Sequence, residues 1–156
     1  MEPVSLILHD IRSSENVGSM FRTADAAGVS KIYLTGYTPA PLDRFGRKNA
    51  KLTKAALGAE EFVPWEKHED IFSLIEELKM NGVRVVAVEQ DPAAVLYMEL
   101  RRGGQTAFIL GNEVDGVPPD VLRAADAIVE IPMQGKKESL NVAVAAGIIL
   151  FRGLSE

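Results

Sequence analysis

Short apolar segments alternate with helical segments along most of this chain, and this alternation limits the fold more than any other sequence feature. The apolar segments lack the strict polar alternation of a sheet that has one face in water. Such strands are buried on both faces, so the sequence predicts an α/β fold, a mostly parallel sheet with helices on both faces. The predicted strands are residues 4–9, 31–36, 60–65, 83–88, 106–110 and 127–131.

Helices are predicted where apolar residues recur with the period of one helix face. The clearest case is residues 15–28, with apolar side chains at Val17, Met20, Phe21 and Ala24. Asn16 is its predicted N-cap, and Gly28 ends it. Further helices are predicted at 51–56, at 69–82, just before Ala125 and at 142–150.

Composition excludes several classes of protein. The 156 residues suffice for one domain, expected to span 1–156. A net charge of −5 argues against a protein that holds nucleic acid through its overall field, so a polyanion partner needs a local basic patch. With no cysteine and two separated histidines, His9 and His68, no metal site is predicted and neither histidine is expected to be catalytic.

The sequence also predicts a soluble, cytoplasmic protein. The first ten residues contain an acid where a secretory signal has basic residues. The longest apolar stretch, 142–151, is shorter than the ~20 residues that a membrane span needs.

Three loops are expected to meet at one edge of the sheet, because ligands of parallel sheets bind beyond the carboxyl ends of the strands. These loops contain Glu89 and Gln90, residues 111–116, and residues 133–138. Glu113, directly after a buried strand, needs a partner or water. A positioned polar pair of Asn112 and Glu113 is therefore predicted beside a glycine turn.

The last helix has no polar face between residues 142 and 150, so it is expected to be enclosed on all sides. Its small residues permit close approach by backbone, a ligand or a partner subunit. Ser139 is predicted to cap it, with the Asn141 amide alongside. A core helix with an ordinary cap is the alternative, but it leaves Asn141 unexplained.

Arg22 has two interpretations. It pairs with Asp25 at i+3 on a solvated face, or it belongs to a functional cluster with Asn16 and Gly18. The second is favoured because Gly18, one turn from Arg22, lacks a side chain and leaves room for something to approach that face. Both stay open at this point.

Residues 44–54 form the local basic patch, with no acid among them. Phosphate binding and a solvated loop are both compatible with this pattern. Lys136 and Lys137 add charge of the same sign. The basic residues of the segment are Arg44, Arg47, Lys48, Lys51 and Lys54.

Three segments together, "NVGSMFRTADAAG", "FILGNEVDGVP" and "IPMQGKKESLNVAVAAGIIL", resemble the three ordered motifs of the SpoU class of RNA ribose 2′-O-methyltransferases. This class belongs to the knotted SPOUT superfamily. The resemblance covers nearly the whole chain. It implies a C-terminal trefoil knot, an exception to the rule that chains avoid knots, with S-adenosylmethionine bound in it. It also implies a homodimer whose interface completes the active site.

The resemblance assigns roles to individual residues. It implies that Arg22 is the catalytic arginine, that Asn16 and Glu113 position the reacting groups, and that Ser139 and Asn141 lie near the transferred methyl. The residues implied to bind the cofactor are Glu89, Gly111, Ile131, Met133 and Leu140. Because no separate RNA-binding domain is expected within 1–156, transfer or ribosomal RNA is expected to contact the dimer surface and the basic segment.

The expected reaction is attack by a ribose 2′-hydroxyl on the methyl group of a sulfonium. A guanidinium normally stays protonated, so Arg22 is expected to stabilise the forming alkoxide, with proton removal by Arg22 as the alternative. Two other functions stay open. One is an RNA- or nucleotide-binding module without turnover, and the other is a SPOUT enzyme that methylates a base.

Overall fold

Seven parallel strands form one sheet in the computed structural model, which describes residues 2–101 and 103–152. The spatial order is β3-β2-β1-β6-β4-β7-β5, and every strand pair is parallel. The strands are β1 Val4–His9, β2 Lys31–Thr35, β3 Trp65–His68, β4 Arg84–Val88, β5 Val95–Leu96, β6 Thr106–Leu110 and β7 Ala127–Glu130.

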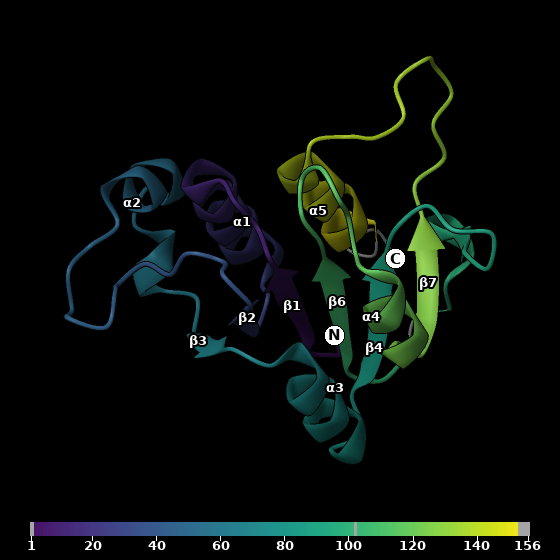
Figure 1. Cartoon of the computed structure of the whole chain (residues 1–156), viewed down its shortest axis with the longest axis horizontal. Coiled ribbons are helices and arrows are strands. Elements are labelled where there is room, and N and C mark those ends of the chain that lie inside the picture. Colours follow the sequence, from purple (N-terminus) through teal and green to yellow (C-terminus); the bar gives the residue numbers. More distant parts are fainter. Residues whose placement is uncertain (1, 102, 153–156) are drawn as a thin grey trace.

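Helices cover both faces of this sheet, which confirms the predicted α/β class (Figure 1). The helices are α1 Ser14–Ala27, α2 Ala50–Ala56, α3 Ile71–Met80, α4 Pro119–Ala124 and α5 Val142–Phe151, with 3-10 turns η1 Ala59–Glu61 and η2 Tyr97–Glu99. Along β1, Leu6 and Leu8 pack into the core under α1, α2 and α5, whereas Ile7 packs into the core over α3 and α4. Neither face of the central strands is left in water, which explains their continuous apolar sequence.

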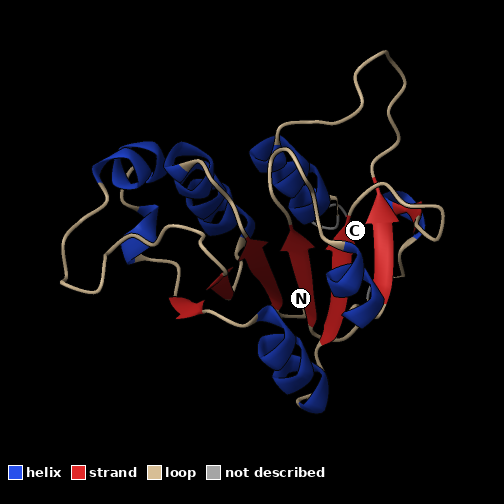
Figure 2. Cartoon of the chain, viewed as in Figure 1, coloured by secondary structure: helices blue, strands red, loops and turns tan. Residues whose placement is uncertain are grey.

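The carboxyl ends of β1, β6, β4 and β7 point to the same edge of the sheet (Figures 1 and 2). From that edge the chain leaves β7 in a long loop, residues 131–141, which projects beyond the sheet before it enters α5. No helix in the described part of the chain is long and apolar enough to cross a membrane.

Helix α1 begins earlier than its apolar pattern predicts. Ser13 is its N-cap, with an extended backbone and a hydroxyl that accepts a hydrogen bond from the Asn16 N–H at 3.1 Å. The prediction that Asn16 is the cap is therefore wrong. Asn16 lies within the first turn, where its side-chain amide is available to other segments.

The predicted strand at 60–65 is also wrong. Residues 59–61 form a 3-10 turn after Gly58, whose φ is +90°, and strand β3 starts only at Trp65. Strand β3 lies at the sheet edge and contains polar, partly exposed residues, so it lacks the apolar run that identifies inner strands. Strand β5 at the opposite edge, Val95–Leu96, was not predicted either, because two exposed residues are too short a run to identify a strand.

Helix α5 is not enclosed on all sides within one chain. Val142, Ala146, Ile149 and Leu150 are buried in the core beneath it. The opposite face leaves Val144 52% exposed and Phe151 43% exposed, so the prediction of full enclosure is wrong for the single chain. The cap also differs from the prediction: Asn141 Oδ1, not Ser139, accepts from Ala143 N–H at 2.9 Å and from Val144 N–H at 3.3 Å.

Candidate active site

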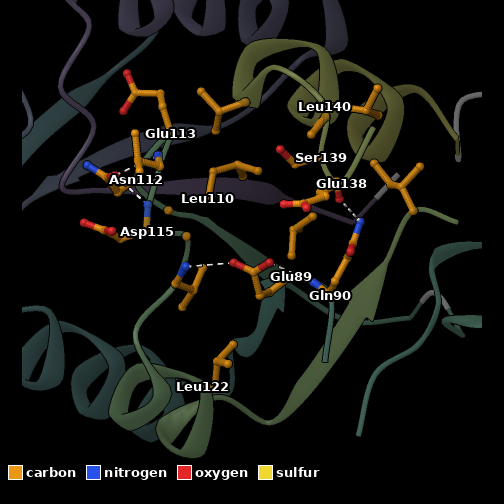
Figure 3. A pocket seen from close by; sticks show the side chains of 18 of the residues that line it. Glu89, Gln90, Leu110, Asn112, Glu113, Asp115, Leu122, Glu138, Ser139 and Leu140 are labelled. Carbon is orange, nitrogen blue, oxygen red and sulfur yellow. Dashed lines mark hydrogen bonds between the residues drawn. The ribbon is translucent and has the colours of Figure 1, made fainter. Parts of the chain in front are cut away.

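A cleft opens at the carboxyl edge of the sheet, between the ends of β4, β6 and β7 (Figure 3). Its volume is about 390 Å³, within the usual range for small-molecule sites. The three loops expected to share one edge all contribute to its lining. The lining includes the whole set implied to bind the cofactor, Glu89, Gly111, Ile131, Met133 and Leu140, together with Glu113 and Ser139.

The lining combines an apolar wall with a few polar groups. Leu110, Leu122 and Val142 join the apolar members of the predicted set, while Glu89, Gln90 and Ser139 present polar side chains. This division suits a ligand with a flat apolar part and a charged or hydroxylated part.

Glu89 connects the end of β4 to the loop after β6. Its Oε2 accepts a hydrogen bond from Val117 N–H at 2.9 Å, and its Oε1 accepts from Gln90 N–H at 2.8 Å (Figure 3). Gly116 has a φ of +68°, a left-handed conformation that favours glycine, and its missing side chain leaves room for Glu89 Oε2, which an added Cβ would meet at 2.1 Å.

Gln90 connects β4 to the third loop, because its side-chain amide donates to the carbonyl of Glu138 at 2.7 Å. Gly111 lines the cleft at the start of the loop after β6. A Cβ there would lie 2.5 Å from the carbonyl carbon and oxygen of Gly116, so its missing side chain also makes room for the returning loop.

Glu113 links the loop after β6 to the start of α1. Its carboxylate accepts from Arg12 N–H and Ser13 N–H, both at 2.8 Å, and from Asn16 Nδ2 at 3.2 Å. Burial alone would raise the pKa of Glu113, but these donated hydrogen bonds outweigh it and hold the pKa below its ordinary value. The group is therefore an anion at neutral pH.

Asn16 and Asn141 extend this network to the last helix. Asn141 Nδ2 donates to Asn16 Oδ1 at 3.2 Å, while Asn141 Oδ1 caps α5. Asn16 is 97 residues from Glu113 and 125 residues from Asn141 along the chain, and these hydrogen bonds bring the three side chains together. Ser139 is exposed at the cleft two residues before Asn141.

Asn112 has partners that the sequence did not reveal. Its amide is buried, and Nδ2 donates to the Asp10 carbonyl at 2.9 Å and to the Tyr37 hydroxyl at 2.8 Å. Its Oδ1 accepts from Val114 N–H at 2.8 Å, which shapes the turn. Tyr37 belongs to the loop after β2, and no local sequence signal connects it to Asn112.

Arg22 lies apart from the cleft in this chain. It is exposed on α1, and it does not line the cavity. The alternative pair with Asp25 does not form, because the ion pairs among the described residues involve other side chains. Six residues turn a helix by about 600°, so Asn16 and Arg22 point about 120° apart.

The predicted cluster of Asn16, Gly18 and Arg22 is therefore not formed within one chain. Gly18 packs against α2, where an added Cβ would lie 2.2 Å from the Leu52 carbonyl oxygen and 2.8 Å from Ala55 Cβ. The missing side chain of Gly18 does leave room for another group to approach, but that group is helix α2.

Both histidines have side-chain partners. His9 is buried, and its Nδ1 lies 2.9 Å from Thr35 Oγ1. Burial lowers its pKa, although the nearby Asp10 and Asp120 carboxylates oppose this effect. His68 Nε2 lies 2.6 Å from Glu66 Oε1 at the sheet edge. Among the described residues no group of side chains suits a metal ion.

Comparison with known families assigns the chain to one of them. A family model described as the SpoU rRNA Methylase family matches residues 3–151. The chain belongs to the SpoU rRNA methylase family. Among its relatives is the 23S rRNA (guanosine-2'-O-)-methyltransferase RlmB of Neisseria meningitidis serogroup B, 35% identical over 148 residues. The match covers 95% of this chain but only 56% of that relative.

Solved structures of SpoU relatives have the same fold. An AdoMet-bound rRNA methyltransferase from Sinorhizobium meliloti aligns with a TM-score of 0.87 and 32% identity, over 96% of this chain and 55% of that one. A second structure, described as giving insights into the 2-OH methylation of C/U34 on tRNA, aligns with a TM-score of 0.83 and 27% identity. That alignment covers 98% of this chain and 95% of the other.

Proposed function

We propose that this chain transfers a methyl group from S-adenosylmethionine to a ribose 2′-hydroxyl of tRNA or rRNA. One observation supports this most strongly: a single cleft is lined by residues from the second and third SpoU-like segments, and a hydrogen-bonded asparagine pair joins it to the first. The activities named for the relatives, on 23S rRNA and on tRNA, support the same reaction class.

The cleft suits the proposed methyl donor. Its volume and its mixed lining match a ligand with an apolar base and a polar amino-acid end. When bound, S-adenosylmethionine supplies an electrophilic methyl group. Glu89, Gly111, Ile131, Met133 and Leu140 are the residues proposed to hold it, and Glu89 and Gln90 also fix the loops around it.

The chain's polar residues are proposed to orient the acceptor ribose. Anionic Glu113 fixes the rotamer of Asn16 by accepting from its amide, and Asn16 in turn orients Asn141. Ser139 offers a hydroxyl at the same opening. A guanidinium group normally stays protonated, so the proposed role of Arg22 is to stabilise negative charge developing on the ribose oxygen, with proton removal as the alternative.

A homodimer is proposed because two features are left incomplete in one chain. Arg22 is exposed and away from its own cleft, and α5 has an exposed apolar face that includes Val144 and Phe151. If two chains paired through these apolar faces, the faces would be removed from water. Each active site would then combine residues from both subunits. The C-terminal trefoil knot implied by the family resemblance is part of the same proposal.

RNA is proposed to bind the basic segment 44–54. Its basic side chains, Arg44, Arg47, Lys48, Lys51 and Lys54, are all exposed. We also propose a cytoplasmic location, because the relatives named act on ribosomal or transfer RNA.

Incorporation of labelled methyl groups from S-adenosylmethionine into total RNA tests this function. The proposal expects incorporation, followed by resistance to nuclease cleavage next to the modified nucleotide, since a 2′-O-methyl group removes the nucleophile for that cleavage. Label without such resistance would indicate base methylation. RNA binding with no incorporation would instead indicate a binding module without turnover.

A further inference from the structure

An exposed phenylalanine lies within the basic segment, and the proposed function does not use it. Phe45 is 67% exposed and belongs to neither of the two apolar cores. It lies in the loop between β2 and α2, which extends to one end of the molecule (Figure 1). A ring left in water forgoes the stability that burial would provide, so a packing role does not explain this residue.

The segment that presents Phe45 is an ordered turn. Leu42 and Lys48 form an antiparallel bridge, and within it Asp43 N–H donates to the Arg47 carbonyl at 2.9 Å. Asp43 Oδ1 also accepts from Phe45 N–H at 2.8 Å and from Arg47 N–H at 2.9 Å. The residues 43–47, here named the 43–47 turn, therefore hold the ring in a defined place.

Two guanidinium groups flank this ring. The Arg44 Cζ lies 4.8 Å and the Arg47 Cζ 5.0 Å from the Phe45 centroid, within the range of cation–π contact. Arg47 is also fixed from the other side, because its Nε lies 2.8 Å from Asp43 Oδ2. The result is an exposed aromatic ring with two guanidinium groups over it, and one of them, that of Arg47, is also paired with Asp43.

We propose that the 43–47 turn is a stacking site for one unpaired RNA base. Phe45 stacks on the base, and Arg44 and Arg47 contact the base face or the adjoining phosphates. In a continuous duplex every base is already stacked on its neighbours, so the site selects loops, bulges or single strands. This inference rests on the proposed function in one respect, namely that the chain binds RNA.

The stacked nucleotide is not the methylated one in the same chain. The 43–47 turn extends from the side of the molecule that holds β2 and α2, whereas the cleft lies beside β4 and β7 (Figure 1). We therefore expect the turn to bind a nucleotide other than the one held at the cleft of the same chain, and so to contribute to the choice of RNA.

Fluorescence anisotropy with two RNA probes tests the site. The probes are a labelled single strand of about 12 nucleotides and the same strand in a blunt duplex. For the full chain we expect tighter binding of the single strand. Phe45→Leu should weaken single-strand binding about tenfold and leave duplex binding unchanged, because leucine keeps apolar area but has no ring to stack.

Three further variants separate stacking from charge and from general exposure. Phe45→Trp should restore single-strand binding. Phe62→Leu is the matched control, since Phe62 is 72% exposed and none of the arginines that the structure describes makes a cation–π contact with it. This variant should bind like the unmodified chain. Arg44→Gln should reduce the salt dependence of binding, whereas Phe45→Leu should not.

Equal single-strand affinity for Phe45→Leu and the unmodified chain would overturn the proposal, as would equal or tighter binding of the duplex by the unmodified chain. Failure of the proposed function is separately visible, because it would appear as no methyl transfer to total RNA by the unmodified chain. A chain that transfers methyl groups and is insensitive to Phe45→Leu would keep its function and lose this stacking site.

Discussion

Glu113 shows how one side chain supports both the fold and the site. Its carboxylate gathers two backbone N–H groups and the Asn16 amide, so it fixes the entry to α1 and the orientation of a proposed ribose-positioning residue. These donors hold its pKa below the ordinary value in the folded chain. Its contribution to stability is therefore present above the unfolded-state pKa and is lost as the pH falls through the folded-state pKa.

Replacing Glu113 by glutamine should lower the free energy of unfolding by about 1 kcal/mol at pH 7. Both carboxylate oxygens accept hydrogen bonds, and the glutamine NH₂ group would replace one of them with a donor that faces another N–H donor. The effect stays small because the site is partly exposed to water. Urea denaturation as a function of pH measures this. The difference between the two chains should shrink below the ordinary glutamate pKa of about 4.3. A difference that stays constant from pH 7 to pH 3 would contradict the account.

Arg22 is the residue whose charge should matter for turnover but not for donor binding. It lies away from the cleft of its own chain, so Arg22→Ala should leave S-adenosylmethionine affinity unchanged while lowering kcat/KM for RNA about 100-fold. Arg22→Lys keeps the charge but loses the planar fork, so it should recover only a small part of the activity. Near-full activity in the lysine variant would argue against the proposed role.

Between elements, the tightest helix contact is the crossing of α1 and α2 at Gly18. Gly18→Ala would place a Cβ 2.2 Å from the Leu52 carbonyl, so α2 must shift. We expect the free energy of unfolding to fall by about 1–3 kcal/mol. Urea denaturation at neutral pH measures the change.

Gly147 on α5 is the matched control for that substitution. A Cβ there would meet only Thr23 Cγ2, at 3.7 Å, an ordinary contact. Gly147→Ala should therefore stabilise the chain by about 0.5–1 kcal/mol through helix propensity. If both alanine variants were equally stable, the close approach at Gly18 would not be what requires glycine there.

The elements that were predicted well are those whose apolar residues are buried in the core. Strands 4–9 and 106–110 are found at the predicted residues, because each contains a run of buried apolar residues. Strand β3 was misplaced because edge strands bury little. The choice of Asn141 over Ser139 as the cap of α5 depends on where the 131–141 loop enters the helix, which local sequence does not specify.

The candidate site was predictable to a similar degree. The residues that line the cleft could be predicted from two features of the sequence. One is the position of the strand ends, since parallel strands bring their carboxyl ends to one edge of the sheet, and the other is the family resemblance. The bonds of Glu89 to Val117 and of Asn112 to Tyr37 join residues far apart in sequence, so only the folded chain reveals them.

For the whole molecule, the exposed apolar face of α5 predicts association. Val144→Asp would place a charge in the proposed interface, so the variant should sediment as a monomer where the unmodified chain sediments as a dimer. It should also lose methyl transfer if the active site needs both subunits. A variant that remains dimeric, or an unmodified chain that is monomeric at high concentration, would contradict this arrangement.

Calorimetric titration of S-adenosylmethionine into the purified chain tests the central claim most directly. The account predicts saturable binding at one site per chain. Leu140→Asp, which places a carboxylate in the apolar wall of the cleft, should weaken that binding, whereas Leu57→Asp, at an exposed leucine outside the cleft, should not. No binding by the unmodified chain, or equal binding by the Leu140 variant, would contradict the proposal that this cleft holds the methyl donor.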